Sequence, residues 1–175
     1  YLWIYHGLRY GYEAERPSTE TFETVSTEET ITQEFIAREY YLKGIEFVFI
    51  NLAEDGNGEL DFRVLDSDGR IKANSEIAIS SVTAGEWEFI PLRVRLKAGE
   101  SYILEISAKD CSIPPYVLAR EKGTVGENTV LTASGAETSL ELLNAYGFAV
   151  SASRLERLLI TVMLAVCLFG LWIFW

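Results

Sequence analysis

Apolar and polar residues alternate with a period of two through the middle of the chain, and this pattern predicts β-strands. The alternation is clearest at 31–36, 60–65 and 102–106, where apolar side chains recur at every second position, with Gln33 as the exception. The segment 45–50 differs, because it is apolar at almost every position. That pattern is typical of a central strand buried on both faces.

The spacing of these segments predicts the fold class. Turn signals of Asp, Asn and Gly, residue types that tolerate positive φ, lie at 55–58 and 66–69. Between 87 and 96 the apolar phase shifts at Ile90–Pro91, which predicts a bulge or bend and places Trp87 among the buried positions. Short strands about ten residues apart, without amphipathic helices, predict an all-β antiparallel sandwich, and the bend favours a jelly roll over a meander. Weaker alternation predicts further strands at 21–26, 77–79, 116–120, 129–133, 139–143 and 146–150.

The end of the chain has a different pattern. From Leu158 to Trp175 there is no charged side chain, and an uncharged apolar stretch of about 18 residues is long enough to be a transmembrane helix candidate. Ser153 and Glu156 have the spacing of a capping box. We predict a transmembrane helix over 153–175, following a β-sandwich domain over 19–151. The alternative is a buried core helix.

The beginning of the chain is apolar and rich in Trp and Tyr over residues 1–12. Such a stretch resembles the interfacial collar of a preceding membrane helix, where amphipathic rings sit at headgroup depth. We therefore predict that residues 1–18 are a collar and that the sandwich is a loop between two membrane spans. An ordinary first strand or loop is the alternative.

The net charge of the chain argues against several classes of binding partner. The formal net charge of −11 over 175 residues argues against nucleic acid, and against docking on anionic lipid or an anionic wall polymer. By the positive-inside rule, Arg154 and Arg157 alone would place this end of the domain on the cytoplasmic side. The rule is weak, however, for long loops that translocate as domains. Of the two cysteines, Cys111 lies in the polar domain and Cys167 in the apolar stretch, so they cannot pair.

No catalytic apparatus is visible. His6 is the only histidine and has no nucleophile elbow near it. We interpret Cys111 as a buried small hydrophobic residue or an inert thiol, not as a nucleophile. The stretch Asp55–Gly58 is similar to the middle of an EF-hand loop, but Ala53 and Val64 occupy the positions of its two anchoring carboxylates. We interpret it as a hairpin turn. No cofactor is predicted. A structural calcium ion elsewhere in the sandwich is the alternative, although no ligand set for it stands out.

Three stretches carry a family resemblance: Ile31–Phe35, Leu60–Gly69, and Trp87–Leu92 together with Leu96–Ile106. They resemble the carbohydrate-binding-module-like jelly-roll domain inserted between membrane spans of bacterial polytopic envelope proteins, among them glycosyltransferase-like and polysaccharide-polymerase-like proteins. The resemblance covers roughly residues 30–108. It implies an extracytoplasmic domain at the cell membrane and carries no catalytic residue across.

A sugar is the natural ligand for such a domain, and exposed aromatic rings with polar neighbours would bind it. The candidate rings are Tyr40, Tyr41, Trp87 and Tyr116, with a position in the core as the alternative for each. We expect a non-catalytic accessory module that binds or positions glycan beside the remaining membrane spans. A spacer without a ligand and the sensing ectodomain of a membrane receptor are the alternatives.

Overall fold

The computed structural model describes residues 22–121, 130–148 and 162–163. Residues 22–121 and 130–148 form strands and one 3-10 turn, labelled in chain order. Their bounds are β1 Glu23–Ser26, β2 Ile31–Ile36, β3 Tyr41–Ile50, β4 Glu59–Leu65, β5 Ile71–Ala78, η1 Ile79–Ser81, β6 Trp87–Arg95, β7 Ser101–Lys109, β8 Tyr116–Glu121, β9 Leu131–Ala133, β10 Ala136–Thr138, β11 Leu140–Leu142 and β12 Asn144–Phe148.

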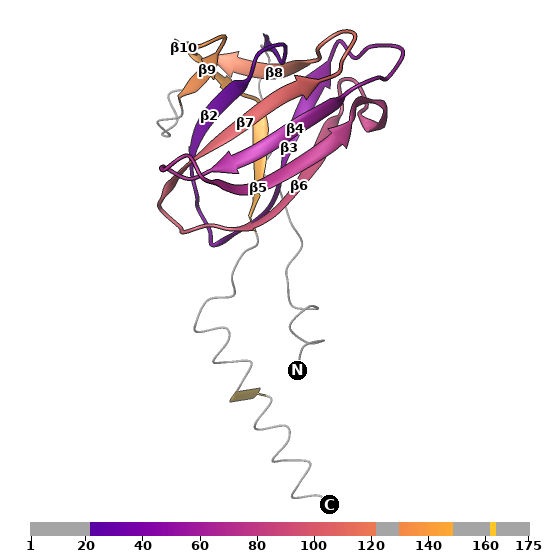
Figure 1. The fold of residues 1–175 in the computed structure, drawn as a ribbon. Coiled ribbons are helices and arrows are strands. Elements are labelled where there is room, and N and C mark those ends of the chain that lie inside the picture. The colour runs from indigo at the N-terminus through magenta and orange to yellow at the C-terminus, as the bar shows by residue number, and fades with distance from the viewer. Residues whose placement is uncertain (1–21, 122–129, 149–161, 164–175) are drawn as a thin grey trace, which may run out of the picture. The chain divides into compact units, whose positions relative to one another are not determined.

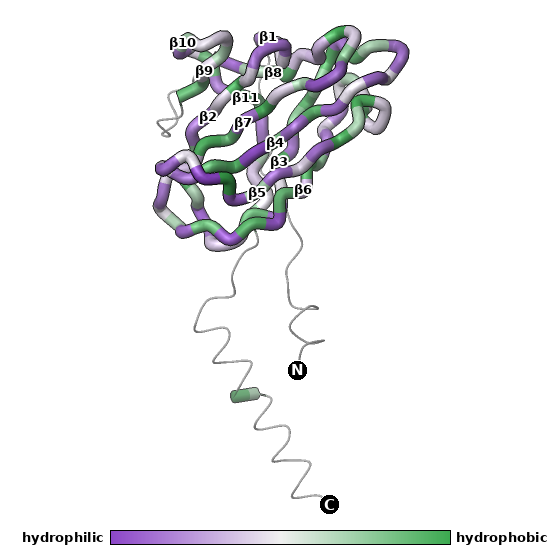
Figure 2. The backbone as a smooth tube through the Cα atoms, in the orientation of Figure 1, coloured by the Kyte–Doolittle hydropathy of each residue, from purple (hydrophilic) through white to green (hydrophobic). Residues whose placement is uncertain are grey.

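The strands form two antiparallel six-stranded sheets that pack face to face (Figure 1). One, which we call the β3 sheet, contains β1, β8, β3 and β12 in order, with β6 on β3 and β11 on β8. The other, the β4 sheet, has the order β10-β9-β2-β7-β4-β5. The predicted all-β antiparallel sandwich is confirmed at this level. Apolar and polar residues alternate along most of the strands, as the sequence pattern requires (Figure 2).

The chain changes sheet at nearly every connection. From β1 to β8 it passes between the two sheets each time, except at the β4–β5 hairpin. Near the end, β11 pairs with β8 and β12 pairs with β3, with only Leu143 between them. The buried side chain of Gln33 on β2 secures this late segment, because its Oε1 accepts a hydrogen bond from the Leu142 backbone N–H at 2.7 Å and its Nε2 donates to the Tyr146 hydroxyl at 3.3 Å.

Aromatic rings from both sheets meet in the core. Phe62 on β4 lies 5.8 Å from Phe47 and 6.2 Å from Phe49 on β3, measured between ring centroids. A second group forms where Phe35 on β2 stacks on Tyr146 on β12 at 4.7 Å. Large rings contribute most of the buried apolar area at such contacts, so they hold the two layers together.

The central position of β3 is confirmed. It pairs with β6 along one edge and with β12 and β8 along the other. Phe47 points into the core, while its neighbour Val48 points to the outer side and is still only 4% exposed. Both faces of the strand are therefore buried, which explains why its sequence is apolar at consecutive positions.

The predicted phase shift in β6 is wrong. The buried positions of this strand are even-numbered throughout, so Trp87 and Phe89 point to the outer side of the β3 sheet. The pairing with β3 slips between Leu42 and Gly44, where β6 has an extra residue, and Arg93 there has a positive φ of 49°. A bulge thus exists, but it lies after Pro91. Trp87, which the phase shift places among the buried positions, therefore lies on the outer side instead.

Two further differences concern weakly patterned strands. The segment predicted to begin a strand at 77–79 contains the end of β5 and the first residue of η1. β5 starts at Ile71 and runs along the edge of its sheet. The inward positions of β5 include Ala73 and Ser75, which carry little hydrophobic signal. The edge strand β10, Ala136–Thr138, was not predicted, and its residues are largely exposed.

Within the described part of the chain, no helix is long and apolar enough to cross a membrane. The predicted helix over 153–175 falls outside that part except for Val162 and Met163, which are helical and exposed. The predicted collar over residues 1–18 lies wholly outside it. Both remain predictions.

Candidate ligand-binding face

Two of the four predicted rings lie on the same outer face. Val48 on β3 is directly opposite Trp87 on β6, and Ile50 is directly opposite Tyr116 on β8. Opposite residues of an antiparallel pair share a face, and Val48 and Ile50 alternate with core residues of β3. Trp87 and Tyr116 therefore flank the end of β3 on its outer side, and both are half-buried.

A third ring, which sequence reasoning missed, lies beside them. Phe89 is opposite Glu46 on the outer side and is 43% exposed. Its ring lies over Gly44, where a Cβ would stand 2.6 Å from the nearest ring atom. The signal for it was its spacing of two from Trp87, which places both rings on one side of a strand. We call Trp87, Phe89 and Tyr116 the ring face.

The remaining two predicted rings lie elsewhere. Tyr41 begins β3 opposite Arg95 and points to the same outer side, but Val48 comes seven residues later, a separation of about 23 Å along the strand. Tyr40 lies in the bend before β3 and is 65% exposed. The structure therefore does not bring the four predicted rings into one site.

The middle of the ring face is buried. Glu46, Val48 and Ala145 point away from the core yet are 6%, 4% and 2% exposed. At the flank of this face, Arg120 on β8 donates a hydrogen bond from Nε to a carboxylate oxygen of Glu141 on β11 at 2.6 Å. The face thus combines partly exposed rings with a covered centre and a polar flank.

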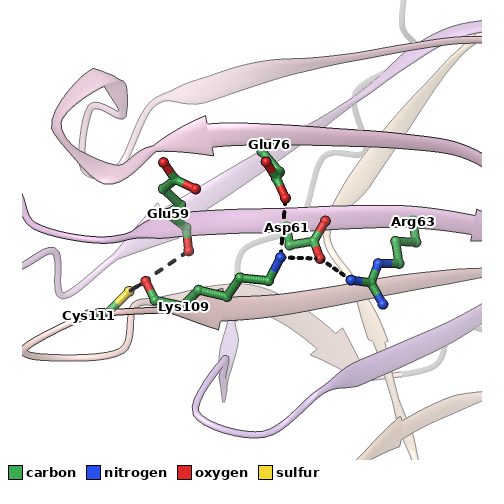
Figure 3. Close-up of polar contacts among 6 residues, drawn as sticks. All are labelled: Glu59, Asp61, Arg63, Glu76, Lys109 and Cys111. Carbon is green, nitrogen blue, oxygen red and sulfur yellow. Dashed lines mark hydrogen bonds and ion pairs between the residues drawn. The ribbon is translucent and has the colours of Figure 1, made fainter.

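A charged cluster occupies the outer side of the other sheet (Figure 3). The carboxylate of Asp61 on β4 is 2% exposed, and its Oδ2 lies 2.7 Å from the guanidinium of Arg63 and 2.8 Å from the Nζ of Lys109 on β7. Lys109 also contacts Glu76 on β5 at 3.2 Å. Hydrogen bonds to Asp61 and then to Glu76 raise the pKa of the Lys109 amino group.

This cluster links three neighbouring strands by charge-assisted contacts. Its other carboxylate oxygen, Asp61 Oδ1, is buried and accepts no hydrogen bond from the described residues. Those residues contain no group of three or more His, Cys, Asp or Glu side chains that could hold a metal ion. The chemistry visible on this side is therefore cross-strand ion pairing.

The EF-hand-like stretch is a turn, as predicted, but it does not close a hairpin. It connects β3 to β4, which belong to different sheets. Asp55 Oδ1 accepts hydrogen bonds from the backbone N–H of Asn57 at 3.2 Å and from the Ser112 hydroxyl at 3.1 Å. The first of these bonds is the main cause of the lowered pKa of Asp55. Gly56 and Gly58 have positive φ values, which explains the glycines.

Cys111 lies next to this turn. Its Sγ donates to the backbone oxygen of Lys109 at 3.2 Å, and a Cβ at Gly58 would stand 2.5 Å from that sulfur. Burial raises the pKa of the thiol above its ordinary value of 9.0. Burial thus disfavours the thiolate, which is the reactive form of a cysteine. His6 and Cys167 lie outside the described residues.

The rate at which Cys111 is alkylated should reflect the raised pKa of its thiol. In the full chain carrying Cys167→Ser, we expect iodoacetamide to react with Cys111 at pH 7 at least about tenfold more slowly than it reacts with the free thiol of glutathione. The reason is that the thiolate is the reactive form. The rate, followed by mass spectrometry, should keep rising beyond pH 9. Fast labelling at pH 7 that does not increase with pH would contradict the raised pKa.

Comparison of the sequence with models of protein families and with curated proteins found no match.

Proposed function

We propose that this chain is a membrane-tethered, extracytoplasmic jelly-roll domain whose ring face binds glycan. Its role is accessory and non-catalytic: it holds a polysaccharide beside the membrane spans of a cell-envelope protein. The tether is the apolar segment at 153–175, and the family resemblance supports the outer side of the membrane.

Strand order supports the jelly roll. The chain alternates between the layers, giving β1-β8-β3-β6 in one sheet and β2-β7-β4-β5 in the other. In each sheet a late strand lies beside an early one, β8 beside β1 and β7 beside β2. This is the arrangement of the two Greek keys in an eight-stranded jelly roll. On this proposal β9 to β12 are additions that extend both sheets.

The placement of Trp87, Phe89 and Tyr116 on one outer face is the observation that carries the glycan proposal. Sugars present apolar C–H faces that stack on aromatic rings, and their hydroxyls require polar partners at the margin. Three partly exposed rings on one side of a rigid sheet, with the Arg120–Glu141 pair at the flank, meet both needs. A rigid sheet also keeps the ordering cost of binding low.

A structural spacer without a ligand is the second candidate. The burial of Glu46, Val48 and Ala145 in the middle of the ring face favours it, because side chains that are already covered cannot contact a ligand. The two candidates differ in whether the rings at the margin are available to a sugar.

A glycan array probed with the full chain in nanodiscs tests the proposal. We expect binding to at least one envelope-type polysaccharide, and we expect Trp87→Ala and Tyr116→Ala each to weaken it at least about tenfold, the loss typical of a central aromatic anchor.

Tyr40→Ala is the matched control, because this exposed ring lies away from the ring face and its loss should leave glycan binding unchanged. An array without hits for the wild-type chain would favour the spacer. Binding that survives both ring substitutions would place the site elsewhere on the domain.

A further inference from the structure

Charged residues are divided unequally between the two ends of the sandwich. At one end, the loops 37–40 and 96–100 are joined by backbone hydrogen bonds, and the β4–β5 hairpin loop lies beside them at the start of β7 (Figure 1). We call these loops, each with three residues of the flanking strands, the basic end; it comprises 34–43, 63–73 and 93–103. The opposite loops, extended in the same way, form the acidic end; it comprises 24–33, 48–61, 76–89 and 107–118.

The basic end carries eight of the ten Lys and Arg residues within the described ranges but five of their 21 Asp and Glu residues, a formal charge of +3. The acidic end carries one cation and ten carboxylates, a formal charge of −9. The overall charge of −11 therefore conceals a strong separation along the strands. The eight cations are Arg38, Lys43, Arg63, Arg70, Lys72, Arg93, Arg95 and Lys97.

Apolar side chains are exposed among these cations. Ile36, Tyr40 and Ile71 are 44%, 65% and 57% exposed, and all three belong to the basic end. Exposed aliphatic and tyrosine side chains surrounded by Lys and Arg are typical of surfaces that rest on a bilayer, where apolar groups reach the acyl boundary and cations meet headgroups.

The chain also leaves the sandwich at this end. Phe148, the last residue of β12, pairs with Leu42 at the start of β3. The predicted membrane helix begins at 153, five residues later, and five residues reach at most about 17 Å. The proposed tether is therefore joined to the sandwich at the basic end.

We infer that the basic end docks on the headgroups of an anionic phospholipid bilayer. This inference rests on the membrane tether proposed above. The ten residues of β3 span about 33 Å. At physiological salt, electrostatic interactions between exposed charges more than about 8 Å apart are largely screened. The carboxylates in the loops of the acidic end, such as Glu54 and Glu86, are thus too distant to repel the lipid. Asp61 lies nearer, but its charge is paired with Arg63 at 2.7 Å. The net charge of the chain, taken alone, had argued the opposite.

Arg93 and Arg95 are the cations best suited to this contact. Both are exposed on the outer side of β6, and neither forms an ion pair with a described residue. Lys97, by contrast, is engaged with Glu100 at 3.0 Å. An unpaired guanidinium can bind phosphate through two parallel hydrogen bonds without first breaking an internal pair.

Hydrogen exchange of the full chain in nanodiscs tests the inference. One set of discs contains only phosphatidylcholine, and in the other about a third of the lipid is phosphatidylglycerol. We expect amides of the loops 37–40, 66–70 and 96–100 to exchange at least about threefold more slowly in the anionic discs. Arg93→Gln combined with Arg95→Gln should remove most of this protection, and so should high salt.

Glu54→Gln combined with Glu86→Gln is the control, because it alters charge at the acidic end and should leave the lipid dependence unchanged. Equal exchange in the two kinds of disc would overturn the docking while the tether stands. Failure of the chain to enter nanodiscs would overturn both. Protection of these loops by a soluble anionic polysaccharide, without any effect of lipid charge, would assign the basic end to a glycan instead.

Discussion

Replacing Phe62 with alanine is expected to lower the free energy of unfolding of the sandwich by about 3–5 kcal/mol. Phe62 is fully buried and contacts Phe47 and Phe49 across the layers. Its removal would leave a cavity between two sheets that cannot close around it without shifting β3, which pairs along both edges. Urea denaturation of the full chain, followed by circular dichroism of the β-sheet signal, measures the loss.

Phe22→Ala provides the comparison. Phe22 is the same residue type but is 50% exposed, so its truncation should cost less than about 1 kcal/mol. If Phe62→Ala cost as little as Phe22→Ala, the two layers could not be held together by the ring cluster.

The substitution Gly44→Ala should be nearly as damaging, by about 3 kcal/mol, although it adds only one methyl group. A Cβ at this position would stand 2.3 Å from the backbone oxygen of Ile90 and 2.6 Å from the ring of Phe89. A ring can rotate away, but a carbonyl in the β3–β6 ladder can move only if the strands separate. The same denaturation experiment detects the effect.

Gly69→Ala is the matched control for Gly44→Ala. Gly69 has a positive φ of 76° but open space around it, so alanine there meets only the cost of a left-handed conformation, about 1 kcal/mol. A larger loss at Gly69 than at Gly44 would refute the steric argument.

The alternation of apolar and polar residues predicted the strands best where one face of a strand is buried and the other is exposed to solvent. At β2, β4 and β7 the alternation located the strands and separated inward from outward side chains correctly. It failed at β5, where inward positions such as Ala73 and Ser75 are too small to contrast with their neighbours. It misassigned Trp87, because aromatic residues on an outer face look like core residues in a sequence.

The candidate site could be predicted only in part. Residue type identified Trp87 and Tyr116, but their shared face depends on β6 and β8 pairing with opposite edges of β3. Strands so distant in sequence become neighbours only through topology, which no local pattern encodes. The same holds for the basic end, whose cations come from three separate loops and the strand residues that flank them, and become one surface only in the folded sandwich.

The position of β12 constrains how this domain can be made. The last strand of the sandwich lies against its central strand, and Gln33 near the beginning holds the segment that leads into it. A nascent chain therefore cannot complete its β3 sheet until residue 148 has emerged, immediately before the apolar segment follows. A recombinant fragment cut at the limit of the family resemblance, near residue 108, would lack β8 to β12 and leave one edge of β3 unpaired.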